Sequence, residues 1–238
     1  DAGASRGSIS RKKINSNVID TELSGNSKYI LCVSHLYPYK NIVRLLIAYK
    51  QVLDTTKTSA KLMIAGSGGY SYYDNEIKKC IVDLNIHNNV VLLGGVKREN
   101  LKELYLNACL LAFPSPFENF PYTLVEAMSC GTPIVCSNTT AMPEACKNAA
   151  LYFDPYDTQD MAAKIALILE NDMLRQEMSK KSIIRAKELP EAEIQRIEYD
   201  LKDELIRETI MDTEESVEEI KAQLEKIDQR LYELQQRR

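Results

Sequence analysis

The first two thirds of the chain alternate between short apolar runs and longer amphipathic segments. Several of the short runs are continuously apolar, without the alternation of apolar and polar positions that marks a strand with one solvated face. Such runs are typical of strands covered on both faces, as in a parallel sheet. The pattern predicts strands at residues 28–34, 61–66, 89–94, 110–115 and 133–137.

The segments between these runs have apolar residues at helical spacing. Residues 41–53, 73–84 and 98–110 are predicted to be helices, and a further helix is expected to begin near Tyr122. Strands that alternate with helices of this length form βαβ units, so we predict an α/β fold with a doubly wound parallel sheet. Ligands of such sheets bind beyond the carboxyl ends of the strands. The loops to consider are residues 34–41, 66–72, 94–98, 115–122 and 137–143.

The pattern changes after about Glu188: residues 191–238 contain no glycine and many charged residues. Residues 189–212 are predicted to form a helical extension and residues 213–238 a coiled coil, because apolar residues recur there at steps of three and four. We expect self-association, or binding of a partner helix, through this last segment. Its apolar positions are Val217, Ile220, Leu224, Ile227, Leu231 and Leu234.

Composition narrows the function classes. A chain of 238 residues with 45% hydrophobic content can bury a core, and a net charge of -4 argues against a general nucleic-acid binder. No apolar run approaches the roughly 20 residues of a membrane helix. Residues 1–27 lack the apolar centre of a signal peptide and are predicted to be a flexible lead-in.

The cysteines point to a reducing compartment. Six are present, none is in a CxxC pair, and most have apolar neighbours, so we expect buried, reduced thiols and a cytoplasmic protein. Two histidines are too few for a His-rich metal centre. The cysteines are Cys32, Cys80, Cys109, Cys130, Cys136 and Cys146.

Several candidate ligand-binding residues lie in the stretch PSPFENFPYTLVEAMSCGTP, residues 114–133. A helix that begins near Tyr122 would offer unpaired N–H groups and partial positive charge, which suit a phosphate group. Glu118 in the preceding loop could accept hydrogen bonds from sugar hydroxyls, and Glu126 from a pair of ribose hydroxyls. Lys40 would supply positive charge opposite a diphosphate. The glycines of GSGG, residues 66–69, would allow close backbone approach to a ligand.

The segment ENFPYTLVEAMSCGTPIV resembles the E-x7-E motif of the GT-B glycosyltransferases, most of all their large retaining family four. The segments VSHLYPYKNIVRLLIAY, MIAGSG, VVLLGGVKRENLKELYLNA and AMPEACKNAALYFDP agree with it in order. The resemblance covers residues 28–188 and corresponds to the C-terminal, nucleotide-sugar-binding half of such enzymes, a Rossmann-like domain.

The resemblance implies roles for individual residues. Lys40 would neutralise the donor diphosphate and Glu118 would act at the transferred sugar, which makes these two the candidate catalytic residues. The candidate donor-binding residues are Ser67, Val96, Asn119, Phe120, Pro121, Tyr122, Thr123 and Glu126, with Val96 near the base and Glu126 on the ribose.

Two departures from the family pattern change what is expected. His35 stands where many members have an arginine, which weakens the expectation of a second basic residue at the diphosphate. Asn119 and Pro121 replace glycines that are commoner in this loop, and they would tune sugar preference.

The implied reaction is hexosyl transfer with retention from a nucleotide-diphosphate sugar to a glycan or lipid-linked acceptor, as in surface polysaccharide biosynthesis. No metal or other cofactor is expected, and the sequence has no Asp-x-Asp pair. The protein would work in the cytoplasm or, through partners, at the inner face of the membrane.

The acceptor-binding half is not accounted for, because about 27 residues before the first strand are too few for a domain. We expect that half to be deleted or to lie on another chain, so that the domain alone binds donor without transfer. Other GT-B activities remain open: a nucleotide-sugar epimerase, or a phosphorylase, for which no pyridoxal lysine stands out. A non-catalytic assembly module built around the coiled coil is a further alternative.

Overall fold

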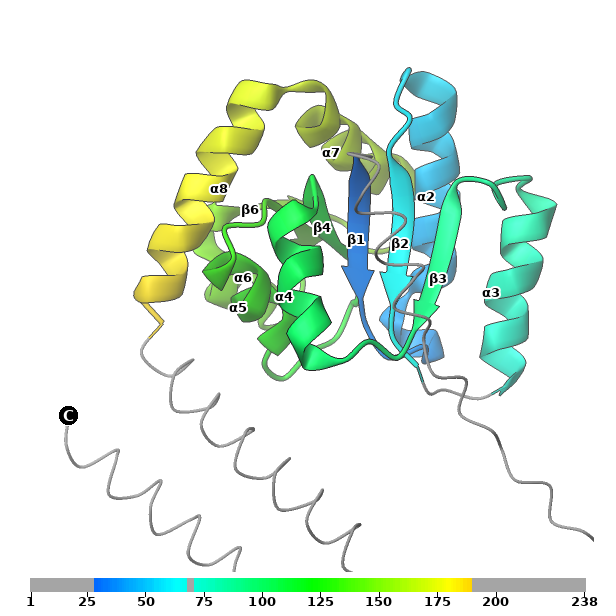
Figure 1. Cartoon of the computed structure of the whole chain (residues 1–238), viewed down its shortest axis with the longest axis horizontal. Helices are drawn as coiled ribbons and strands as arrows, with labels where there is room; N and C mark the ends of the chain where they lie inside the picture. The colour runs from blue at the N-terminus through cyan, green and yellow to red at the C-terminus, as the bar shows by residue number, and fades with distance from the viewer. Residues whose placement is uncertain (1–27, 68–70, 190–238) are drawn as a thin grey trace, which may run out of the picture. The chain divides into compact units, whose positions relative to one another are not determined.

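Six parallel strands form one sheet in the order β3-β2-β1-β4-β5-β6 (Figure 1). The structure is a computed structural model that describes residues 28–67 and 71–189. The predicted lead-in and coiled coil, and all but the first residue of the helical extension, lie outside these residues. The strands are β1 (Tyr29–Val33), β2 (Lys61–Ala65), β3 (Val90–Gly94), β4 (Leu110–Phe113), β5 (Ile134–Ser137) and β6 (Ala150–Phe153).

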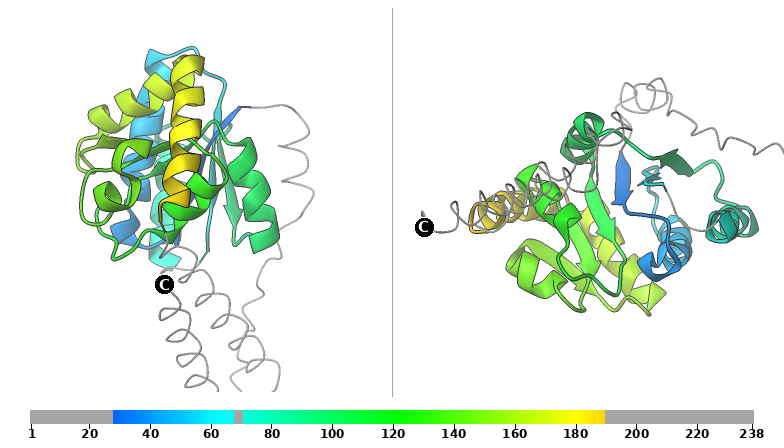
Figure 2. Two further views of the ribbon diagram at one scale, coloured as in Figure 1. Left: turned by 90° about the vertical axis from the view of Figure 1, so that its left-hand side faces the viewer. Right: turned by 90° about the horizontal axis from the view of Figure 1, so that it is seen from below.

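Helices cover both faces of the sheet (Figure 2). On one face α2 (Ile42–Thr55) packs against α3 (Ser71–Asp83) and α7 (Thr158–Glu170). On the other, α4 (Arg98–Asn107) packs against α5 (Tyr122–Ser129), which contacts α6 (Met142–Cys146). The remaining elements are the 3-10 turns η1 (Pro38–Lys40) and η2 (Lys147–Ala149) and the helix α8 (Asp172–Lys187). The predicted doubly wound α/β fold is confirmed.

The central strands explain the continuously apolar runs of the sequence. Every residue of β4 and β5 is buried, as are four of the five residues of β1. Both faces of these strands lie under helices, so neither face needs polar residues. The core therefore sits around β1 and β4, at the middle of the sheet.

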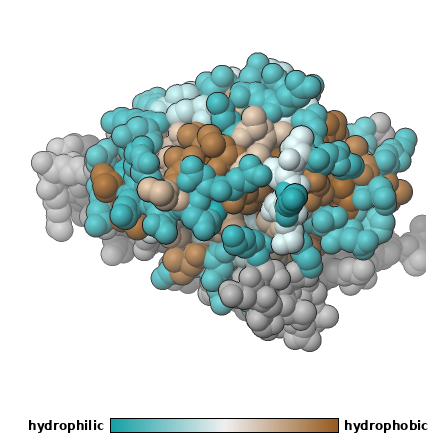
Figure 3. Space-filling model, turned by 90° about the horizontal axis from the view of Figure 1, so that it is seen from above, coloured by the Kyte–Doolittle hydropathy of each residue, from teal (hydrophilic) through white to brown (hydrophobic). Residues whose placement is uncertain are grey.

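The strand order reverses between β1 and β4, because the chain moves outward from β1 through β2 to β3 and then crosses back. The loops after β1 and β4 consequently leave the sheet side by side and turn to opposite faces. In open α/β sheets this switch point is where a ligand-binding crevice forms. Figure 3 views the opposite edge, where the strands begin, as a mixed surface of hydrophobic and hydrophilic patches.

Each strand and helix predicted between residues 28 and 137 is present, with ends that differ by up to three residues. β4 ends at Phe113 rather than residue 115, since Pro114 and Pro116 cannot donate ladder hydrogen bonds. The short strand β6 was not among the predicted strands. All six cysteines are free, as predicted, but Cys80, Cys109 and Cys130 are only half-buried.

Candidate functional site

Two loops at the switch point form the candidate site. The first leaves β1, passes through η1 and enters α2 at Asn41, whose φ of 63° lies in the left-handed region. Asparagine tolerates this conformation better than most residues. The second loop runs from Pro114 to Pro121, between β4 and α5. Lys40 ends η1 and Glu118 lies within the second loop, so both are at the carboxyl edge of the sheet.

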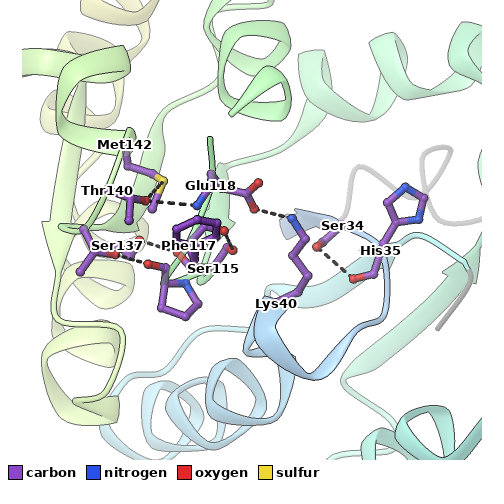
Figure 4. Close-up of polar contacts among 11 residues, drawn as sticks. Ser34, His35, Lys40, Ser115, Phe117, Glu118, Ser137, Thr140 and Met142 are labelled. Atoms are coloured by element: carbon purple, nitrogen blue, oxygen red, sulfur yellow. Dashed lines mark hydrogen bonds and ion pairs between the residues drawn. The ribbon is translucent and has the colours of Figure 1, made fainter. Parts of the chain in front are cut away.

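Lys40 and Glu118 form an ion pair across the two loops (Figure 4). The Nζ atom of Lys40 lies 2.5 Å from Oε1 of Glu118, and the two side chains are 12% and 14% exposed. The Lys40 ammonium also lies 4.9 Å from the ring centroid of Tyr39. A cation and an anion so shielded from water interact more strongly than an exposed pair. The two candidate catalytic residues thus share one location.

Asn41, the residue after Lys40, links the loop after β1 to the loops after β4 and β6. Its side-chain amide donates to the carbonyl oxygens of Pro114 at 3.1 Å and Pro155 at 2.7 Å, after β4 and β6 respectively. Its amide oxygen accepts from Arg44 at 3.0 Å. Asn41 is 5% exposed, so these bonds replace contacts with water. The bond to Pro114 fixes the start of the Glu118 loop relative to η1.

Glu126 has a different partner. One turn into α5, its Oε2 atom accepts a hydrogen bond of 2.9 Å from the hydroxyl of Tyr105, near the end of α4. Burial, followed by the charge of Glu126 and the hydrogen bond to it, raises the pKa of Tyr105 well above its ordinary value. The phenol therefore stays a donor and orients the carboxylate. Among the described residues no contact joins Glu126 to Lys40 or Glu118.

The start of α5 follows the prediction. Pro121 is buried and precedes the first helical residue, Tyr122. The rings of Phe120 and Tyr122 meet edge to face with centroids 5.0 Å apart. Thr123 in the first turn is half-buried, and Asn119 is exposed. The first amides of α5 lie at the same sheet edge as Lys40, because a helix after a parallel strand starts where that strand ends.

Gly66, the first glycine of GSGG, has a packing role at the ends of β1 and β2, whereas Gly68 and Gly69 lie outside the described residues. A Cβ atom on Gly66 would lie 1.7 Å from the carbonyl oxygen of Ser34, so Gly66 is required where β1 and β2 end together. The Ser67 carbonyl oxygen lies 3.0 Å from Nδ1 of His35, which joins these two loops. Ser67 is exposed beside Gly95, and the neighbouring Val96 is half-buried.

The sequence reasoning did not single out Asn41 or Tyr105. An asparagine directly before a predicted helix was a usable signal, because asparagine favours turn and left-handed conformations. Tyr105 gave no signal, since its partner lies in another helix 21 positions away.

Comparison with known proteins identifies the family. The family model for glycosyl transferases group 1 matches residues 14–185. The O-antigen chain mannosyltransferase B of Escherichia coli is 33% identical over 161 residues, which cover 67% of this chain and 42% of the relative. A Campylobacter jejuni N-acetylgalactosaminyltransferase that acts on a diphospho-undecaprenol-linked sugar is 31% identical over 204 residues, or 79% of this chain and 53% of the relative. The chain spans about half the length of these curated relatives.

Solved structures share the fold. HepE of Anabaena, in complex with UDP and glucose, has a TM-score of 0.64 at 21% identity, over 72% of this chain and 47% of that one. Sucrose-phosphate synthase of Thermosynechococcus elongatus has a TM-score of 0.62 at 21% identity, over 79% and 49%. The resemblance found in the sequence is confirmed: with the family model matched over most of the domain, the chain belongs to the group 1 glycosyl transferases.

Proposed function

We propose that residues 28–188 are the donor-binding half of a retaining glycosyltransferase that takes a hexosyl group from a nucleotide-diphosphate sugar. The observation that supports this most directly is the shielded Lys40–Glu118 pair at the switch point, beside the start of α5. It combines a cation suited to a diphosphate with a carboxylate suited to sugar hydroxyls. A solved structure of the same fold, HepE, holds UDP and glucose, which agrees with a ligand of this class.

In the proposed reaction the bond between the anomeric carbon and the diphosphate oxygen breaks. A bond forms between that carbon and a hydroxyl oxygen of the acceptor, and the hydroxyl proton leaves with the diphosphate. Negative charge develops on the departing diphosphate, where Lys40 and the first amides of α5 would stabilise it. Glu118 would hold the sugar and Glu126 the ribose. No metal or other cofactor is part of this proposal.

The acceptor would be a glycan or a lipid-linked sugar in surface polysaccharide synthesis. This follows the names of the relatives, one an O-antigen chain mannosyltransferase and the other acting on a diphospho-undecaprenol-linked sugar. Within residues 28–67 and 71–189, no helix is both long enough and apolar enough to span a bilayer. We place the reaction in the cytoplasm, with access to the inner face of the membrane through partners.

Calorimetric titration tests the proposal. The chain is titrated with UDP, GDP and ADP and with their glucose, mannose and N-acetylhexosamine conjugates. We expect one nucleotide class to bind, with a further gain in affinity from the correct sugar. If no member of the panel binds, the proposal is wrong.

Lys40→Met then localises the site. It keeps the aliphatic length but removes the charge, so binding of the nucleoside diphosphate should weaken much more than binding of the bare nucleoside. Lys50→Met is the matched control: Lys50 also pairs with a carboxylate, that of Asp54, but it lies in the last turns of α2, away from the switch point. Equal loss for both ligands in Lys40→Met would show that Lys40 acts through the fold instead.

A further inference from the structure

We infer that Thr140 is a positioning residue that holds Glu118 in place for the transferred sugar. The inference rests on the proposed function, because it assigns a support to the carboxylate that would contact that sugar. Thr140 lies in the loop between β5 and α6. The sequence placed this loop among those at the ligand-binding edge of the sheet, but no residue of it was a candidate site residue. It is one of several hydroxyl residues that meet the Glu118 loop (Figure 4).

Four consecutive residues of the Glu118 loop each have a main-chain atom held by a hydroxyl. The Ser137 hydroxyl donates to the Ser115 carbonyl at 2.6 Å, and the Thr139 hydroxyl donates to the Pro116 carbonyl at 2.7 Å. The Ser115 hydroxyl donates to the Phe117 carbonyl at 3.0 Å, within the loop itself. The Glu118 amide completes the series, since it donates to Oγ1 of Thr140 at 3.2 Å.

Thr140 differs from the other three because its hydroxyl is the acceptor. Its own proton points to the Met142 sulfur, 3.8 Å away, which is a weak acceptor. Met142 is fully buried and fixed at the start of α6. With its proton engaged there, the oxygen presents a lone pair to the Glu118 amide. The bond therefore depends on an orientation that the surroundings set.

The backbone of Thr140 is held in an unusual conformation. Its φ is 48°, in the left-handed region that β-branched residues avoid. In the described ranges the other non-glycine residues with positive φ are Asn41, Asn85 and Lys147, none of which is β-branched. Strained residues persist where the surroundings determine them, and such sites gather at functional positions. Here the strained residue is the one that contacts the main chain of Glu118.

Fixing the Glu118 amide limits where its carboxylate can reach. That carboxylate already contacts Lys40 from the opposite loop, so the residue is held at both its main chain and its side chain. Loss of the Thr140 bond should leave the Lys40 contact to the diphosphate in place but loosen the contact to the sugar. The expected effect is on the gain in affinity that the sugar adds, not on binding of the nucleoside diphosphate.

Three variants separate positioning from stability. Thr140→Val keeps the shape and the strain but removes the acceptor, and Thr140→Ser keeps the hydroxyl. Thr140→Gly removes the hydroxyl and relieves the strained conformation, so it should melt close to or above the wild-type temperature. Thr56→Val is the matched control, because the Thr56 hydroxyl likewise accepts from a main-chain amide, that of Thr58 at 3.3 Å, and donates a bond of its own, to the Val52 carbonyl. It lies at the end of α2, far from the loop.

Two measurements are made on the full chain: the ratio of affinities for the nucleotide sugar and its nucleoside diphosphate, and the exchange rate of the Glu118 amide. Thr140→Val and Thr140→Gly should lower the ratio about three- to tenfold, the effect of one lost hydrogen bond. Both should also speed the amide exchange, while Thr140→Ser and Thr56→Val stay near wild type. A merely structural role would lower the ratio only in variants that melt early.

An unchanged ratio in Thr140→Gly, with wild type still gaining affinity from the sugar, would overturn the inference and leave the proposed function standing. Unchanged exchange of the Glu118 amide in both Thr140→Val and Thr140→Gly would overturn it without any ligand. If wild type gains nothing from any sugar while the Glu118 amide still depends on Thr140, the proposed function is wrong and the support serves another ligand.

Discussion

The ammonium of Lys40 lies 2.5 Å from the Glu118 carboxylate although 78 positions separate them in the chain. In the proposed reaction these residues serve different parts of the donor, Lys40 the diphosphate and Glu118 the sugar. A diphosphate that approaches Lys40 must therefore compete with a carboxylate that already contacts it. The two roles are coupled, and the coupling can be measured.

Replacing Glu118 by Gln should tighten binding of the nucleoside diphosphate while removing the gain from the sugar. The neutral amide no longer competes for Lys40 and no longer repels the diphosphate, so affinity should rise about three- to tenfold at low salt, and less at high salt. Titration at two ionic strengths measures this. Asp54→Asn, which breaks the exposed pair with Lys50, should change nothing. Weaker diphosphate binding in Glu118→Gln would contradict the prediction.

Tyr105→Phe should weaken nucleotide binding through Glu126. Without the 2.9 Å hydrogen bond, Glu126 would lose the orientation needed for its proposed ribose contact, and we expect a loss of about three- to tenfold in affinity for the nucleoside diphosphate. The 2′,3′-dideoxy nucleotide lacks the hydroxyls in question and serves as the control ligand. If both nucleotides lose affinity equally, Tyr105 supports the fold and not the ribose contact.

Asn41→Ala should destabilise the domain by about 2–4 kcal/mol. It removes the hydrogen-bond donor of the buried carbonyl oxygens of Pro114 and Pro155, each at a cost of about 1–3 kcal/mol. It also puts alanine into the left-handed region. Asn85→Ala is the control, since Asn85 has a similar φ of 53° but is exposed. Urea unfolding of both variants isolates the hydrogen-bond contribution. Similar losses in the two variants would assign the effect to backbone conformation alone.

Gly66→Ala should be poorly tolerated, with a loss of folded protein at ordinary temperatures. The added Cβ would sit 1.7 Å from the backbone oxygen of Ser34, which can move only if the ends of β1 and β2 separate. Gly95→Ala is milder, because its nearest neighbour is the Ser67 hydroxyl at 2.9 Å, on a side chain that can rotate. Thermal melts rank the two variants, and equal melting temperatures would contradict the close packing at Gly66.

Stability should decline as pH rises above about 9. Burial raises the pKa of Cys32 to about 12 and raises the pKa values of Tyr29 and Tyr49 above 10. In the unfolded chain these groups ionise near their ordinary values, about 8.5 for cysteine and 10 for tyrosine, while the folded state keeps its protons. The unfolded state then binds fewer protons, so the free energy of unfolding falls with pH. Urea midpoints between pH 7 and 10.5 check this, and a flat profile would refute it.

Much of the fold could be predicted from the sequence because buried parallel strands have a recognisable pattern of apolar residues. Runs such as YILCV and LLAF are apolar at every position, and the helices between them keep one apolar face. The strand β6 was not predicted, although its four residues, ALYF, are apolar like those of β4; two of them are only half-buried. Its place is fixed by pairing with β5, a contact that local pattern does not reveal.

The candidate site was predictable only where a motif marked it. Lys40 and Glu118 were singled out from their segments, and the structure places them in contact. Their supports were not foreseen, because Asn41, Tyr105 and Thr140 act through partners distant in the chain. A hydroxyl or amide whose hydrogen-bond partner is distant in the chain produces no characteristic spacing in the sequence.

The Glu118 loop is held through its main chain, which has a consequence for how the proposed preference for a donor sugar could change by substitution. Phe117 is 58% exposed and Asn119 is also exposed, whereas the bonds that shape the loop use backbone atoms of residues 114–118. Side chains at 117 and 119 can be exchanged without refolding the segment that presents them. In the proposed function, libraries confined to these two positions would vary the preference for the donor sugar on a constant backbone, with little effect on folding.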